Sequence, residues 1–104
     1  MDFASFLKNF SVENNKIVYG MKDGYFVFAT LLKDGYLRNV KEINAQNGFI
    51  ALKEYIDYVL KCGYKTIYKT KNNTITIDKK EFERVLEYEK KRIWKVYNQW
   101  NFTR

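Results

Sequence analysis

The tetrapeptide Lys-Asp-Gly-Tyr occurs twice, at 22–25 and at 33–36, and each copy follows an apolar run. Asp-Gly between two such runs is typical of a type I′ β-turn, which needs a positive φ at both central residues. The repeat therefore predicts an antiparallel meander of three strands, near residues 16–22, 25–32 and 36–42, joined by two-residue turns.

Period-two alternation divides the side chains of this meander between two faces. One face is expected to carry Ile17, Tyr19, Met21, Phe26, Phe28, Leu32 and Leu37, and the other Val18, Tyr25, Val27, Ala29, Leu31 and Val40. An antiparallel sheet with one face in water should alternate apolar with polar residues. Since both faces are apolar here, both are expected to be covered, by helices or by a second subunit.

Three other segments place apolar residues at helical spacing and predict helices over 2–10, 49–62 and from 79 to about 100. The stretch 11–15 is expected to break the first helix. Core periodicity assigns several aromatic residues to the interior, namely Phe26, Phe28, Phe49 and Phe82.

Local signals mark the ends of the later helices. Asn44 or Asn47 can cap the second helix, and Gly63 stands where a helix commonly ends in a left-handed residue. Asp78 and Glu81 resemble a capping box before the third helix.

The segment 64–77 alternates strictly around Asn72-Asn73 and predicts a second hairpin. Without a proline or a low-complexity linker, the chain reads as one α+β domain over 1–104, in the order αβββαββα.

The net charge of +7 is concentrated near the C-terminus. Residues 1–63 contain eight Lys/Arg and seven Asp/Glu, whereas residues 64–104 contain eleven and five. Such asymmetry indicates an acidic partner such as nucleic acid, an anionic surface or an acidic protein. The alternative is a charged face that only keeps a small domain soluble.

Helical phasing places a ridge of cations on the side of the last helix opposite its apolar stripe, interrupted by Glu87. The short connection at Asp78 places the lysines of the hairpin beside this ridge, and Trp94 lies off the apolar stripe as a possible contact anchor. The candidate binding residues are Lys65, Lys69, Lys71, Lys80, Arg84, Lys91, Lys95 and Trp94.

Several function classes are disfavoured by what the chain lacks. It has no histidine, one cysteine (Cys62) and no glycine-rich phosphate loop, so no catalytic residue, metal or cofactor is expected. A single cysteine suits a reducing compartment, and neither a membrane-length apolar run nor a signal peptide is apparent. A cytoplasmic location without membrane association is therefore expected.

The first hypothesis is a non-enzymatic protein that binds DNA or RNA backbone with weak sequence preference, since arginines are few. The alternative is a phage- or mobile-element-encoded inhibitor, of anti-defence or anti-CRISPR type, that binds a host protein. A third is a histidine-free ribonuclease toxin using Arg84, Arg92 or Tyr88. A homodimer through the sheet face or the C-terminal helix is compatible with each.

Overall fold

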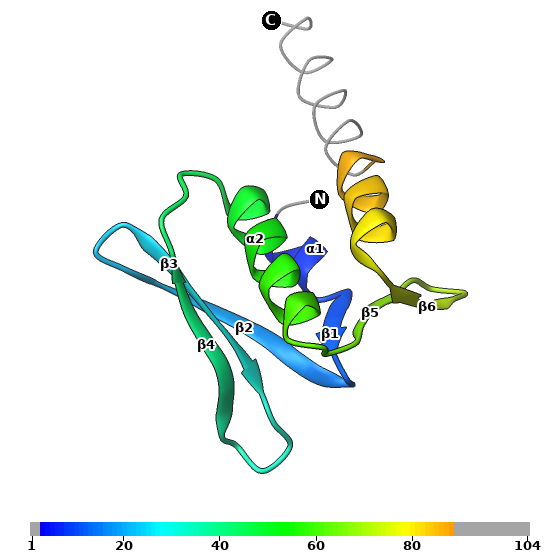
Figure 1. Ribbon diagram of the computed structural model, residues 1–104, viewed down its shortest axis with the longest axis horizontal. Helices are drawn as coiled ribbons and strands as arrows, with labels where there is room; N and C mark the ends of the chain where they lie inside the picture. Colours follow the sequence, from blue (N-terminus) through cyan, green and yellow to red (C-terminus); the bar gives the residue numbers. More distant parts are fainter. Residues whose placement is uncertain (1–2, 89–104) are drawn as a thin grey trace, which may run out of the picture.

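The computed structural model describes residues 3–88 and confirms the predicted α+β class (Figure 1). Its elements are α1 (Phe3–Leu7), β1 (Phe10–Val12), β2 (Asn15–Lys22), β3 (Tyr25–Leu31), β4 (Leu37–Ile43), α2 (Gly48–Lys61), β5 (Thr66–Lys69) and β6 (Thr74–Ile77). Residues 79–88 form a further helix. The order of the elements follows the prediction except for one added strand, β1.

That added strand joins the meander and the C-terminal hairpin into one six-stranded antiparallel sheet, in the order β4-β3-β2-β1-β5-β6. Ser11 on β1 pairs with Lys16 on β2 and with Ile67 on β5. The helix predicted over 2–10 therefore ends early, at Leu7, while residues 11–15 are non-helical as expected. A strand of three residues is too short to show a period of two, and so it leaves no pattern in the sequence.

The two copies of Lys-Asp-Gly-Tyr form different turns. In the first, Asp23 and Gly24 have φ of 51° and 81°, as the predicted type I′ turn requires. In the second, only Gly35 has a positive φ, of 92°. The Leu32 N–H donates to the Tyr36 carbonyl at 2.9 Å, which closes a wider loop over residues 32–36.

The wider loop changes the register of β4. The Asp34 carboxylate accepts a hydrogen bond from the Tyr36 N–H at 3.1 Å and holds the loop open. Leu37 then pairs with Leu31 and shares its face, so the prediction that placed Leu37 on the Phe26 face is wrong. A bulge at Asn39, with φ of 56°, follows and adds one residue to β4.

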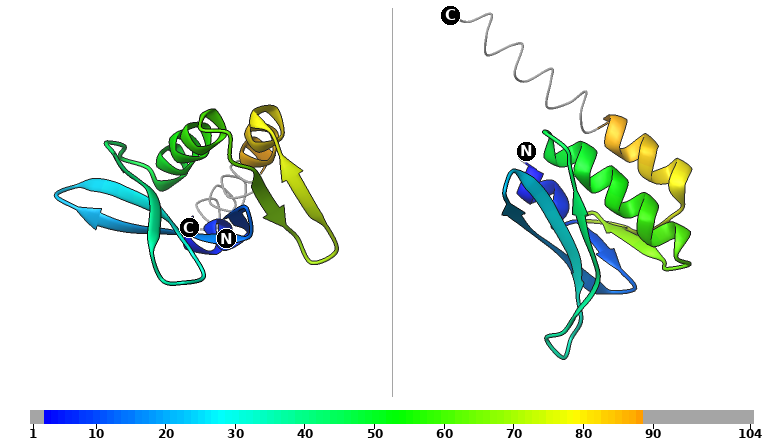
Figure 2. Two further views of the ribbon diagram at one scale, coloured as in Figure 1. Left: turned by 60° about the horizontal axis from the view of Figure 1, so that its bottom comes forward. Right: turned by 60° about the vertical axis from the view of Figure 1, so that its left-hand side comes forward.

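The helices pack on one face of the sheet, with α2 and residues 79–88 side by side (Figure 2). Phe3 of α1 makes edge contacts with Phe28 on β3 and Phe49 on α2. The buried apolar core comprises Phe6, Leu7, Phe10, Val12, Ile17, Phe28, Ile43, Ala51, Leu52, Tyr55, Ile56, Val59, Tyr68, Ile77, Phe82 and Leu86. Within residues 3–88 no helix covers the opposite face, so the expected cover by helices is found on one face only, and cover of the other by a second subunit stays a prediction.

The predicted caps are confirmed. The Asn47 side chain accepts a hydrogen bond from the Phe49 N–H at 2.8 Å, and Gly63 has φ of 88° after the end of α2. Asp78 accepts from the Glu81 N–H at 2.8 Å. In the part of the chain that the structure describes, every helix is too short or too polar to cross a membrane.

Candidate nucleic-acid interface

The described part of the last helix carries no net charge. Residues 79–88 contain Lys79, Lys80 and Arg84 against three glutamates. Arg84 forms an ion pair with Glu81, one turn away. Lys80 is exposed, but the helix segment 79–88 carries as many negative as positive side chains. This segment therefore has no net attraction for an anionic ligand. Three other residues of the predicted interface, Lys91, Trp94 and Lys95, lie outside the described residues.

All charged side chains of the β5–β6 hairpin are positive. Residues 64–77 include three lysines and no acidic residue. Lys65, Lys69 and Lys71 are all exposed, and none forms an ion pair with a described residue. The Thr70 N–H donates to the Asn73 carbonyl at 2.8 Å, so Lys71 stands in the turn at the tip.

The hairpin and the last helix are neighbours, as the short connection predicted. Tyr68, Thr70, Arg84, Val85 and Tyr88 line a surface cavity of about 350 Å3 between them. Tyr68 is buried on the helix side of the sheet. Successive residues of a strand point to opposite faces, so the residues on either side of Tyr68 point to the face that the helices leave open.

The described cations of the hairpin and of the last helix are divided between the two sides of the sheet. Lys69 lies on the open face of the sheet, whereas Lys80 and Arg84 belong to the helix layer on the other face. The Lys65 carbonyl accepts a hydrogen bond from the Glu13 N–H at 2.8 Å, so the backbone pairing next to β5 continues to Lys65. The alternation of side chains between the two faces therefore includes Lys65 as well. Lys65 and Lys69 thus lie on the same open face.

The sheet brings a further lysine, Lys16, to this face. Lys16 on β2 pairs with Ser11, and Ser11 pairs with Ile67, which lies midway between Lys65 and Lys69 in the sequence. Paired residues of an antiparallel sheet point to the same face, and neighbouring strands lie about 5 Å apart. Lys16 is therefore roughly 10 Å from β5, across a single strand. We call Lys16, Lys65 and Lys69 the open-face lysines.

Acidic groups near the open-face lysines are engaged elsewhere. Glu13, in the turn between β1 and β2, forms an ion pair with Arg38 at 3.4 Å. Glu42, on β4, lies 3.8 Å from Lys22. Lys16 is exposed and, like the other two open-face lysines, forms no ion pair with a described residue.

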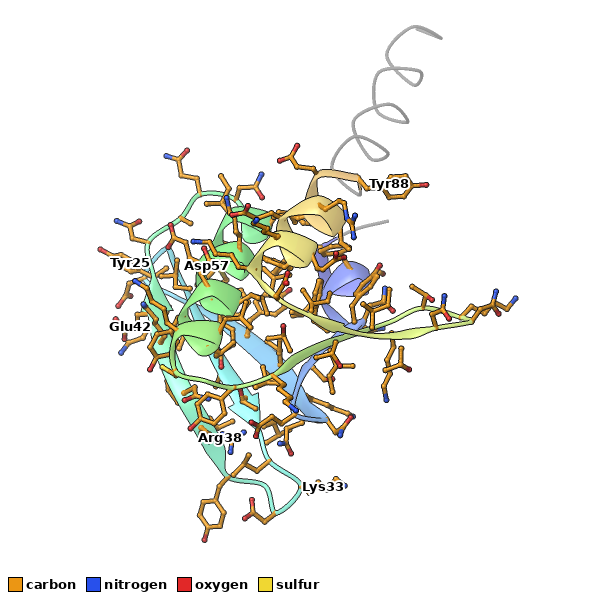
Figure 3. The ribbon with its side chains drawn as sticks, turned by 45° about the vertical axis from the view of Figure 1, so that its right-hand side comes forward. Tyr25, Lys33, Arg38, Glu42, Asp57 and Tyr88 are labelled. Carbon is orange, nitrogen blue, oxygen red and sulfur yellow. The ribbon has the colours of Figure 1, made fainter. Side chains whose placement is uncertain are left out.

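Lys33 lies beside Asp34 in the loop between β3 and β4, where Figure 3 labels it. Lys16 and Lys33 both line a surface cavity of about 320 Å3, together with Asn14, Asn15, Leu31 and Leu32. Amide and ammonium groups are hydrogen-bond donors suited to a phosphate oxygen. Sequence reasoning missed both residues: Lys16 is linked to the hairpin only through the undetected strand β1, and Lys33 lies in a loop wider than the predicted turn.

An apolar area adjoins the open-face lysines. Leu37 pairs with Leu31, and Leu31 pairs with Lys16, so the three follow one another across neighbouring strands. Leu37 is 56 % exposed. Val40, also on β4, is 56 % exposed. The open face therefore combines unpaired cations with exposed apolar side chains.

Comparison of the chain with protein-family models, with curated proteins and with solved structures finds no match. The function is therefore inferred from the geometry of the open face.

Proposed function

We propose that this protein is a non-enzymatic nucleic-acid-binding protein that contacts the phosphate backbone through the open face of its sheet. The observation that carries the proposal is the convergence of Lys16, Lys65 and Lys69 on one face, where no described helix covers them and no acidic residue within 3–88 forms an ion pair with them. Lys71, at the tip of the adjoining β5–β6 hairpin, extends the same charge.

The physical basis is the release of counterions. Each lysine that neutralises a phosphate frees a condensed counterion, and this term dominates binding without sequence preference. The open-face residues include no arginine that could read guanine by a bidentate hydrogen bond, so the proposed contacts position the backbone and do not select bases. Lys80 and Arg84 contribute less, because the helix that carries them is neutral over residues 79–88.

The test is a fluorescence-anisotropy titration of a labelled oligonucleotide over a series of salt concentrations. The triple variant Lys16→Gln, Lys65→Gln, Lys69→Gln should bind more weakly at low salt. Its plot of log affinity against log salt should be less steep by about 2, as expected when three contacts to a single strand are lost.

The matched control removes three lysines on the helix side, by Lys8→Gln, Lys61→Gln and Lys79→Gln. All three are exposed and form no ion pair with a described residue. The control variant and the triple variant have the same net charge. If the open-face lysines form the binding surface, the control variant should keep the wild-type slope of log affinity against log salt. Equal slopes for the two variants would show a general effect of charge and would contradict the proposal.

The alternative, an inhibitor encoded by a phage or mobile element that binds a host protein, is favoured by a different observation. Leu37 and Val40 are each 56 % exposed, which is the kind of apolar surface that a protein partner covers. If the alternative holds, nuclease-treated host lysate should yield a partner that the Lys→Gln triple variant still captures and that a Leu37→Thr, Val40→Thr variant does not.

A further inference from the structure

The β5–β6 hairpin extends away from the helices and from the meander (Figures 1 and 3). Every residue from Lys69 to Thr76 is exposed, so the outer half of the hairpin stands clear of the domain on both of its faces. Within the two strands, only Tyr68 and Ile77 belong to the buried apolar core. The outer half of the hairpin therefore adds little to the core and is accessible to a ligand.

The loop at the tip of this hairpin differs in charge from the other turns of the sheet. Glu13 lies in the turn between β1 and β2, Asp23 in the turn between β2 and β3, and Asp34 in the loop between β3 and β4. Within residues 3–88, the loop between β5 and β6 is the only connection between successive strands of a hairpin without an acidic residue, and it carries Lys71. This tip can therefore approach a polyanion without repulsion.

The tip also carries two asparagines, Asn72 and Asn73, whose side chains the turn does not use. The Thr70 N–H donates to the Asn73 carbonyl at 2.8 Å, and the Asn73 N–H donates to the Thr70 hydroxyl at 3.1 Å. Neither asparagine has a positive φ, the conformation for which turns often select this residue. Neither side-chain amide forms a hydrogen bond with another described residue. Both amides are therefore available to a ligand.

A protein partner is a poorer occupant of the outer half of the hairpin. Residues 69–76 include one exposed large apolar side chain, Ile75, and the others are lysine, threonine and asparagine. The buried centre of a protein interface is apolar, and lysine is depleted there. Ammonium, hydroxyl and amide groups instead match the phosphate oxygens and base edges of a nucleic acid.

The asparagine amide matches one edge of a base pair in particular. It presents a donor and an acceptor side by side, and adenine presents the N7 acceptor and the N6 amino donor in the major groove of B-form DNA. This groove is about 12 Å wide and about 8.5 Å deep, and it admits a two-stranded β-ribbon. The segment 73–76 spans about 13 Å at the usual rise per residue, so the tip can reach the base pairs. In A-form RNA the major groove is too narrow for side chains to read.

We infer that the outer half of the β5–β6 hairpin binds in the major groove of double-stranded DNA, where Asn72 and Asn73 contact adenine edges and the open-face lysines contact the adjoining phosphates. This inference rests on the proposed function and adds base contacts to its backbone contacts. Lys69 connects the two parts of the site, because it lies on the open face and begins the exposed segment. A single strand has no groove, so its binding measures the lysine contacts alone.

The experiment measures the fluorescence anisotropy of labelled duplexes of equal length. The probes are an A·T-rich DNA duplex, the same duplex with 7-deazaadenine in place of adenine, a G·C-rich DNA duplex and an A·U-rich RNA duplex. The protein should bind the A·T-rich DNA about tenfold more tightly than the G·C-rich DNA or the RNA, which is within the discrimination that one bidentate base contact provides. Since 7-deazaadenine removes only the N7 acceptor in the major groove, it should abolish this preference.

The decisive variant is Asn72→Ala with Asn73→Ala. Alanine is compatible with the turn, which the backbone and the Thr70 hydroxyl close, and circular dichroism verifies that the variant is folded. Its affinity for A·T-rich DNA should fall about tenfold, to that for G·C-rich DNA, while its affinity for a single strand stays unchanged. The slope of log affinity against log salt should also stay unchanged, because no charge is removed.

The matched control is Asn44→Ala with Gln46→Ala. It removes two exposed amides that lie before α2, away from the hairpin, and it should keep the preference for A·T-rich DNA.

The outcomes separate this inference from the proposed function. Equal affinity for all the duplexes, together with a less steep salt dependence in the open-face triple variant, overturns the inference and leaves the proposed function standing. A preference for A·T-rich DNA that survives in the Asn72/Asn73 variant places the base contacts elsewhere and also overturns the inference. If the protein binds neither the duplexes nor a single strand, both are overturned.

Discussion

The Thr30 hydroxyl oxygen on β3 and the Tyr55 phenol oxygen on α2 lie 2.9 Å apart, and both residues are fully buried. The Tyr55 ring also stacks on Phe28, with centroids 5.3 Å apart and planes inclined by 21°. One residue of α2 therefore contacts β3 by a polar and an apolar interaction. This contact holds α2 on the face of the sheet that points away from the open-face lysines.

Replacing Tyr55 with phenylalanine should destabilise the protein by about 1–3 kcal/mol, because the buried Thr30 hydroxyl loses its partner. The free energy of unfolding is measured by urea denaturation. A double-mutant cycle with Thr30→Val isolates the pair, since the double variant removes both polar groups. Strictly additive effects of the two substitutions would show that the hydrogen bond contributes nothing.

The same tyrosine should make stability sensitive to alkaline pH. Burial raises the pKa of Tyr55 above its ordinary value of 10.0, and the hydrogen bond with Thr30 offsets part of this effect. The unfolded chain then loses its proton at a lower pH than the folded protein. The stabilisation is complete below pH 10 and is lost as the pH rises toward the raised pKa.

The measurement for this prediction is the urea midpoint between about pH 9 and pH 11, around the unperturbed tyrosine pKa. Tyr55→Phe should flatten the decline. Tyr36→Phe, at a ring that is 72 % exposed, removes the same group from the surface and should leave the decline unchanged. If both variants decline as the wild type does, Tyr55 is not the source.

Gly48 should not tolerate alanine, although alanine is usually the better residue in a helix. A Cβ atom at Gly48 would lie 2.8 Å from the Phe3 ring, in a close approach of α1 to α2. We expect Gly48→Ala to cost about 1–3 kcal/mol, as overpacking does. Gly20→Ala is the control, since a Cβ there meets nothing within 4 Å. A thermal melt in which Gly48→Ala is the more stable variant would refute the contact.

The single substitutions Lys16→Gln and Lys69→Gln should weaken binding of a single-stranded oligonucleotide to a similar extent. Each should make the salt dependence less steep by about 0.7, as the loss of one phosphate contact does. Lys80→Gln should have a smaller effect, because its helix is neutral over residues 79–88. Anisotropy at several salt concentrations measures these changes. A larger loss of affinity for Lys80→Gln than for Lys16→Gln would show that the binding surface lies on the helix.

Local sequence determined the features that depend on neighbouring residues. The Asp23-Gly24 turn, the Asn47 cap, the Gly63 ending of α2 and the Asp78 cap each follow from the conformational preference or hydrogen bonding of residues close in the chain. The α+β class could also be predicted, because apolar residues recur about every 2 residues in some segments, as in strands, and about every 3.6 residues in others, as in helices.

Tertiary structure alone decided which of these elements meet. Lys16 lies 49 residues before Lys65 in the sequence, and β1 brings the two onto one face through pairs that no local pattern specifies. The second Lys-Asp-Gly-Tyr copy forms a wider turn than the first, which places Leu37 beside Leu31. Strand pairing depends on contacts between distant segments, and a register change of one residue moves a side chain to the other face. The sequence therefore predicted a hairpin with exposed lysines, whereas the sheet decided which residues share their face.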